Sequence, residues 1–158
     1  MLKRENAYFE NLEKIGKAYD AEKKASEEKK REIIDTFGYD SEEWEAWKKE
    51  NSENKYPIPA GACKAYRAWM QTIEREEDEV EMNDFLWDKE VEDFIEAFRK
   101  AGIESFIYTN QSTAVMENLH DFEKAGCRME GLTKIKRRER RFGEDQETEI
   151  LGVHFTVC

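Results

Sequence analysis

A long apolar run is missing from this sequence. No stretch reaches the roughly 20 apolar residues that a membrane-spanning helix needs. The first residues, MLKRENAYFENLEK, lack the apolar segment that defines a secretory signal peptide. We therefore expect a soluble, cytoplasmic protein that has no membrane partner.

Cysteine and histidine are scarce. The three cysteines, Cys63, Cys127 and Cys158, are far apart and show no CxxC spacing, which favours a reducing compartment over a disulfide framework. The two histidines, His120 and His154, do not form an HExxH or HxxxH pattern. The sequence therefore predicts no metal site, and Cys127 is expected to be a buried structural residue.

Recognisable catalytic motifs are also absent. The chain contains no glycine-rich loop that would cradle a phosphate, no nucleophile elbow and no Ser–His–Asp order. Aspartate and glutamate are so numerous, 37 in 158 residues, that no catalytic carboxylate pair can be singled out. We expect a protein without a catalytic site and without a cofactor.

Charge is the property that the chain has in excess. Charged residues make up 40% of the sequence, against about 25% in an average soluble domain, and the net charge is −11. Long solvent-exposed helices would account for the excess. Because phosphate binding depends mainly on lysine and arginine, the negative charge makes nucleic acid an unfavourable partner.

The first quarter of the chain is patterned as helix. Residues 2–37 contain no proline and one glycine, and Gly38 is placed to end the helix. Apolar side chains recur at helical spacing in two stripes, separated by the almost wholly polar run AEKKASEEKKRE. Ion pairs one turn apart would support this solvated segment.

Two further helices are expected before residue 83. A capping box formed by Asp40 and Glu43 predicts a short helix that carries Trp44 and Trp47. After a proline-containing loop, a third helix is predicted over residues 62–82. The four tryptophans are expected mainly in the core, although exposed tryptophans also anchor protein interfaces.

The second half alternates between helices and strands. A helix is predicted from an N-cap at Asp88 to Gly102, followed by the strand ESFIYT. A second helix, capped by Ser112, is predicted over residues 112–126. The rest reads as a β-hairpin over residues 128–157 with its turn at FGED, because the last segment alternates with a period of two.

The expected fold class is α+β. A helical arm of about three helices, residues 1–82, precedes a helix–strand–helix–strand–strand unit with a small mixed sheet, residues 83–158, and the two are expected to fold together as one domain. The strands that flank the second helix of this unit should be parallel. Seven apolar side chains are expected to share its core: Phe94, Phe98, Phe106, Leu119, Phe122, Val153 and Phe155.

The tract KIKRRERR holds the main group of candidate site residues: Lys134, Lys136, Arg137, Arg138, Arg140 and Arg141. One interpretation is a nucleic-acid contact, since a β-ribbon can enter a DNA groove. The other is a cross-strand charge ladder in which Arg140 lies opposite Glu147 and Arg138 lies opposite Glu149. We favour the ladder, because the acidic residues stand where a ladder requires them.

The segment TNQST, which joins a strand to a helix, is a second candidate site. The side chains of Thr109, Asn110, Ser112 and Thr113, with free helical N–H groups, could hold an anion. The segment contains no glycine to allow close backbone approach to a phosphate. Simple helix capping by Ser112 and Thr113 is therefore the favoured interpretation.

Two resemblances follow from longer stretches. The parts WDKEV, AGIESF, TNQSTAVMENL and AGCRMEGL resemble a family of uncharacterised small proteins from gut Firmicutes and their mobile elements. This resemblance covers about the last half of the chain and implies genomic context rather than chemistry. The stretch NLHDFEKAGCRMEG is similar to the late helix-to-strand junction of GCN5-related N-acetyltransferases, although the acetyl-CoA loop of those enzymes has no counterpart.

The favoured function is a non-enzymatic, acidic protein–protein interaction module with an unidentified protein partner. It would act as an accessory or inhibitory factor from a mobile element, and its acidic surface could mimic nucleic acid. One alternative is a nucleic-acid-binding protein that uses the basic hairpin 134–141. Another is a degenerate acyltransferase, for which we nevertheless predict no acetyl-CoA binding.

Overall fold

The computed structural model describes residues 2–52 and 55–158, which form an α+β fold. Five helices and four strands lie within this described part. The chain groups into two compact units, and their bounds differ from the expected 1–82 and 83–158. Residues 1–9 and 59–158 make one unit, which we call the body, and residues 10–58 make the other, which we call the arm.

The body contains one four-stranded mixed sheet, in the order β1-β2-β4-β3. Strand β1 (Val80–Met82) pairs parallel with β2 (Ser105–Tyr108), and β2 pairs antiparallel with β4 (Glu144–Val157). Strand β3 (Cys127–Arg141) pairs antiparallel with β4 along almost its whole length. Strands β2 and β3 therefore run in the same direction, as expected, but β4 lies between them.

Three helices accompany this sheet: α3 (Ala60–Glu74), α4 (Asp88–Ala101) and α5 (Val115–Lys124). Five phenylalanines from α4, α5, β2 and β4 form a continuous aromatic core: Phe94, Phe98, Phe106, Phe122 and Phe155. All five have no exposed surface. Leu119 and Val153 are half-buried, so none of the seven expected core residues is exposed.

The third predicted helix was wrong over its last part. Helix α3 ends at Glu74, Glu76 adopts a positive φ of 57°, and residues 80–82 form strand β1. Parallel pairing with β2 buries all three strand residues. A strand of three residues with a glutamate in its middle is too short and too polar to show a period-two pattern.

Several predicted helix starts also needed correction. The N-cap of α2 (Glu42–Glu50) is Ser41 rather than Asp40, and its hydroxyl accepts from the Trp44 N–H at 3.2 Å. Helix α4 has Trp87 at its N-cap position instead of Asp88. Helix α5 starts after Ala114 and has no side-chain cap, so Ser112 does not cap it.

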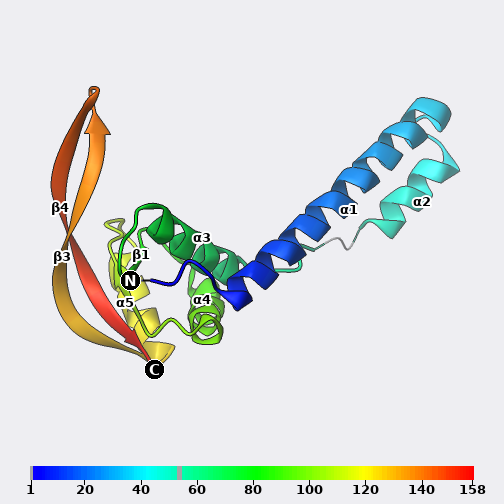
Figure 1. Ribbon diagram of the computed structural model, residues 1–158. Helices are drawn as coiled ribbons and strands as arrows, with labels where there is room; N and C mark the ends of the chain where they lie inside the picture. The colour runs from blue at the N-terminus through cyan, green and yellow to red at the C-terminus, as the bar shows by residue number, and fades with distance from the viewer. Residues whose placement is uncertain (1, 53–54) are drawn as a thin grey trace. The chain divides into compact units, whose positions relative to one another are not determined.

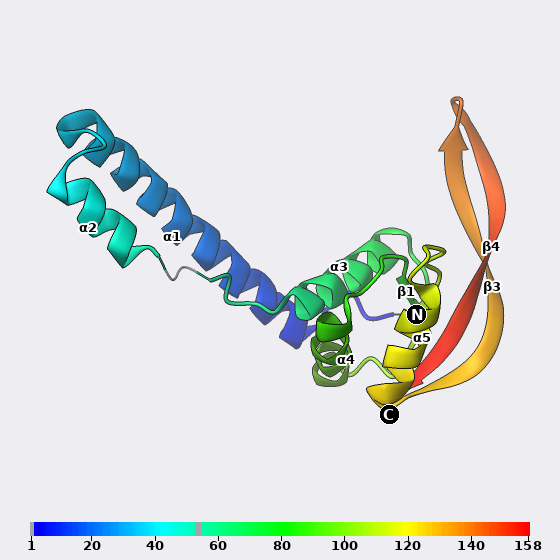
Figure 2. The ribbon, with the colours of Figure 1, turned by 180° about the vertical axis from the view of Figure 1, so that it is seen from behind.

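The long hairpin β3–β4 continues past the rest of the sheet. Only residues 153–156 of β4 pair with β2, and residues 144–152 pair with β3 alone. Figures 1 and 2 show this part as a twisted two-stranded ribbon. The hairpin turn is centred on Phe142 and Gly143, which both have positive φ, as a two-residue type I′ turn requires.

The arm consists of most of α1 (Ala7–Phe37) and of α2. Helix α1 starts five residues later than expected, where the Asn6 side chain accepts from the Phe9 N–H, and Gly38 ends it with a φ of 81°. No helix in the described part of the chain has both the length and the apolar character needed to cross a membrane.

Candidate functional site

The basic tract on β3 divides between the two faces of the hairpin. Lys134, Lys136, Arg138 and Arg140 are exposed and alternate with half-buried residues, so they share one face. Arg137 points to the other face. The side chain of Arg141 lies outside the described part of the structure. Four of the six candidate cations therefore form a column, and one is separated from it.

Acidic residues stand beside this column on β4. Lys136 pairs with Glu149, Arg138 with Glu147, and Arg140 with Asp145. The predicted register was wrong by two residues, because the turn lies one residue earlier than expected. Since the acids on β4 alternate with a period of two, the true register also sets an acid opposite each of these cations.

Arg137 belongs to a buried polar cluster. Its guanidinium is hydrogen-bonded to the carboxylate of Glu81, whose side chain is 1% exposed. Arg75 approaches the same carboxylate at 3.3 Å, and the Thr109 hydroxyl donates to it at 2.7 Å. Two cations and a hydroxyl thus offset the cost of burying this charge.

Glu77 adjoins the same cluster. Burial raises the pKa of the Glu77 carboxyl, and the charge of Glu81 and a hydrogen bond to that side chain raise it further. The charges of Arg75 and Arg137 lower the Glu77 pKa, but the net shift is upward. Sequence reasoning missed this carboxyl pair, because its members lie in the segment that was predicted as helix.

The TNQST segment does not bring its four candidate side chains together. The Thr109 hydroxyl is bound to Glu81, and the Asn110 amide donates to the Asn83 carbonyl while its oxygen accepts from the Ser112 N–H. Ser112 and Thr113 are exposed and line a cleft beside α5. These contacts do not place the four side chains around a single anion site.

That cleft lies beyond the carboxyl ends of the parallel strands β1 and β2. Residues 83–87 follow β1 and residues 109–114 follow β2, and each segment leads into a helix. The cleft has a volume of about 630 Å³, within the usual range for ligand pockets. The carboxyl edge of parallel strands is also where α/β proteins usually bind ligands.

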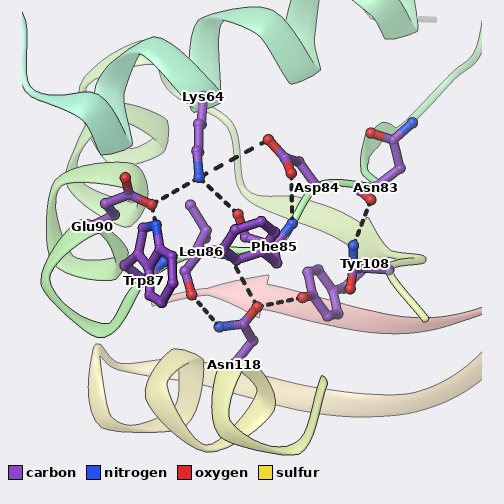
Figure 3. A network of polar contacts seen from close by, with 10 residues as sticks. Lys64, Asn83, Asp84, Phe85, Leu86, Trp87, Glu90, Tyr108 and Asn118 are labelled. Atoms are coloured by element: carbon purple, nitrogen blue, oxygen red, sulfur yellow. Dashed lines mark hydrogen bonds and ion pairs between the residues drawn. The ribbon is translucent and has the colours of Figure 1, made fainter. Parts of the chain in front are cut away.

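The segment 83–87 is held from two sides (Figure 3). From α3, Lys64 Nζ donates to the Phe85 carbonyl and to Glu90 Oε2, both at 2.9 Å. From α5, the buried Asn118 amide donates to the Leu86 carbonyl at 2.5 Å and accepts from the Leu86 N–H at 3.1 Å. These contacts give one wall of the cleft a defined backbone geometry.

A buried tyrosine completes this arrangement. The Tyr108 hydroxyl donates to Asn118 Oδ1 at 2.5 Å, which orients the amide toward the segment 83–87. Burial, assisted by the charge of Asp84, raises the Tyr108 pKa well above its ordinary value. The hydroxyl therefore remains a proton donor in the physiological range of pH.

The arm carries an aromatic cluster, formed by Tyr39, Trp44 and Trp47. The two indoles stack with centroids 5.3 Å apart, and Tyr39 packs edge-on against Trp44 at 5.8 Å. Tyr39 is 67% exposed and Phe37 is 55% exposed. The expectation that the tryptophans lie in a core holds for Trp69 and is wrong for Trp87, which is exposed, while Trp44 and Trp47 are half-buried.

The cysteines and histidines occupy separate places. Burial raises the pKa of the Cys127 thiol to about 11, as expected of a structural cysteine. His154 Nε2 lies 2.8 Å from Glu79 Oε2, while His120 is exposed at the rim of the cleft. Among the residues that the structure describes, no three ligand side chains are grouped to hold a metal ion.

Comparisons with known proteins give one match. The model of a domain of unknown function, DUF7698, matches residues 64–157, which is more than half of the chain. This range includes all residues around the cleft and the whole hairpin up to Val157, and it leaves the arm outside. No curated protein and no solved structure matches the chain. The expected likeness to an uncharacterised family is confirmed: this chain belongs to the DUF7698 family.

Proposed function

We propose that this protein is a non-enzymatic protein–protein interaction module, and that the arm is its partner-binding element. The observation that carries the proposal is the lack of burial over residues 17–57 of the arm. Between residues 17 and 57, no described residue is buried, although this segment carries the aromatic cluster. A helical segment that has no core of its own gains most of its stability from packing against another surface.

The contacts within the arm support the same conclusion. Helix α2 buries none of its residues, and the Lys30 ammonium lies over the stacked indoles, 5.9 Å from Trp44 and 5.6 Å from Trp47. The covered indole N–H of Trp47 has no acceptor in the described structure, which weakens the pairing of the helices. Exposed tyrosine and tryptophan side chains are frequent anchors of protein interfaces.

The net charge of −11 supports a finer version of the proposal. An acidic surface can occupy the basic groove of a nucleic-acid-binding protein, so the module would act as an accessory or inhibitory factor by charge mimicry. In this version of the proposal, the protein originates from a mobile element of gut Firmicutes and acts in the cytoplasm. The nucleic-acid-binding alternative is favoured by one observation, the four exposed cations on one face of the hairpin.

Comparative affinity capture from cells of the native host tests the proposal. We would compare the unmodified protein with a Phe37→Ala/Tyr39→Ala variant, since both side chains belong to the arm and are exposed. A Leu132→Ala variant is the matched control, because Leu132 is 71% exposed on the hairpin. We expect the arm variant to lose a partner that the control retains. Identical sets of captured proteins from all three would contradict the proposal.

A further inference from the structure

The cleft beyond β1 and β2 has an aromatic wall that the fold leaves uncovered. Trp87 is 58% exposed, and its ring packs edge-on against Phe85 with centroids 5.2 Å apart. The backbone beneath these rings is fixed by Lys64 and Asn118 (Figure 3). A large indole held in place at the side of a concave surface is suited to contact a ligand.

Carboxylates surround this wall. Asp88, Glu117 and Asp121 line the cleft, and none of them is ion-paired with a cation in the described part of the chain. Asp88 accepts the neighbouring Lys89 N–H at 2.8 Å. Among the described residues that line the cleft, His120 is the one basic side chain. The rim therefore carries three negative charges without an internal counter-charge.

Two helix N-termini adjoin the cleft and contribute positive charge, opposite in sign to the carboxylates. Helices α4 and α5 both begin there, and each N-terminus contributes about half a positive charge. Three full negative charges outweigh these two half-charges. The free N–H groups that an anion would need are also partly occupied, since the Val115 N–H bonds to the Ser112 carbonyl. The net field in the cleft favours a cation.

We infer that this cleft binds an arginine-bearing segment of a protein partner. A guanidinium is planar, stacks on an indole face and can bind a carboxylate with two parallel hydrogen bonds. The lining supplies both elements in one place: the Trp87 ring and the carboxylates of α4 and α5. A volume of about 630 Å³ exceeds what one side chain fills, so a short segment of chain fits better than a single ion.

This inference is independent of the arm. Its residues all belong to the body, and they lie within the range that the family model matches. Failure of the arm proposal would therefore leave the cleft inference standing, and the reverse is equally true. The two are tested on different variants and with different ligands.

Isothermal titration calorimetry of the full chain with short capped peptides tests the inference. The first peptide contains two arginines spaced by alanine, and the second replaces each arginine by citrulline, which keeps the shape and removes the charge. We expect the arginine peptide to bind and the citrulline peptide to bind at least about tenfold more weakly, because the charge-assisted hydrogen bonds are lost.

Two variants locate the binding. Trp87→Ala removes the aromatic wall, and Glu117→Gln/Asp121→Asn removes two rim charges. We expect each to weaken arginine-peptide binding by about tenfold, the size that a stacked cation or a carboxylate contact commonly contributes. The control, Glu92→Gln/Glu123→Gln, removes the same charge from exposed positions of α4 and α5 outside the lining and should change affinity less than twofold.

Three results would overturn the inference. The first is no binding of the arginine peptide at millimolar concentration. The second is an equal loss in the Glu92→Gln/Glu123→Gln control, which would indicate general attraction to an acidic surface. The third is binding of inorganic phosphate that Trp87→Ala abolishes, which would make the cleft an anion site. Circular dichroism of each variant verifies that the fold persists.

Discussion

Neighbouring arginines on β3 have different roles at the residue scale. Arg137 lies on the inner face, 17% exposed, and pairs with the buried carboxylate of Glu81. Arg138, one residue on, is exposed and faces Glu147 across the strands. In the sequence, the two arginines are indistinguishable members of one basic tract. Only the face on which each side chain lies separates a structural cation from one that is available to a ligand.

This difference predicts unequal effects of truncation. Arg137→Ala removes one of two cations from Glu81 and leaves a buried charge poorly compensated, so it should lower the free energy of unfolding by about 3 kcal/mol. Arg138→Ala, the matched control, should cost less than about 1 kcal/mol because its pair is exposed. Urea unfolding of both variants measures this, and equal losses would contradict the assignment.

Glu77 predicts a pH dependence. Burial and the neighbouring Glu81 raise its pKa above the ordinary 4.5, so folding takes up a proton and an ionised Glu77 destabilises the folded state. The favourable contribution is complete below pH 4.5 and is lost as the pH rises through the higher folded-state pKa. Glu77→Gln should therefore be more stable than the unmodified protein at pH 7, and this advantage should shrink as the pH falls toward 4.5. An advantage that stays constant with pH would show that Glu77 is not perturbed.

The hairpin is the clearest case at the element scale. Its exposed face places Arg138 against Glu147 and Arg140 against Asp145, and the remaining acids lower the local potential. We expect affinity for generic duplex DNA or RNA to be weaker than about 10 μM at physiological salt, beyond the micromolar end of the usual non-specific range. Fluorescence anisotropy measures this. Submicromolar binding that strengthens at low salt would show that the hairpin binds nucleic acid and would contradict this prediction.

Charge reversal on the same face tests the ladder itself. Arg138→Glu/Arg140→Glu sets like charges opposite one another and should cost about 1–2 kcal/mol of unfolding free energy. Adding Glu147→Arg and Asp145→Arg should recover most of that loss, because the pairs are restored with inverted sign. Thermal unfolding of the double and quadruple variants decides it. A quadruple variant no more stable than the double would rule out the ladder.

Much of the element structure could be predicted from the sequence where a pattern was long. The helix from Asp88 and the final strand were found because their periodicities extend over many residues. Strand β1 was missed because it has three residues, and because two partners of its buried central Glu81, Thr109 and Arg137, are distant in sequence. The hairpin register was two residues off because acids spaced by two stand opposite Arg138 and Arg140 in both registers.

The candidate cleft could not be predicted in the same way. Lys64, Trp87 and Asn118 come from three segments that no local pattern connects, and they meet at segment 83–87 only through the tertiary fold. The exposure of Trp87 could not be predicted either, since tryptophan in a polar chain is normally a core residue. The TNQST segment was a useful signal, because Ser112 and Thr113 do line that cleft.

At the scale of the whole molecule, the two units differ in how much they bury. The body holds the aromatic core and almost all of the fully buried side chains, including those of α3, α4, β2 and β4. The arm has no buried residue in the described part of its segment 17–57. Local unfolding is governed by such differences, so the arm should open at a much lower free energy than the body. A binding element without a core of its own can become ordered when it meets its partner.

Hydrogen exchange of the full chain, measured by mass spectrometry in the absence of any partner, tests this central claim most directly. We expect the amides of residues 20–50 to exchange within seconds to minutes, because their helices are marginal in isolation. The amides of β2, β4 and α4 should be protected for hours. If the arm were as slow to exchange as the body, it would already be a self-sufficient structure, and the proposal that it needs a partner would be contradicted.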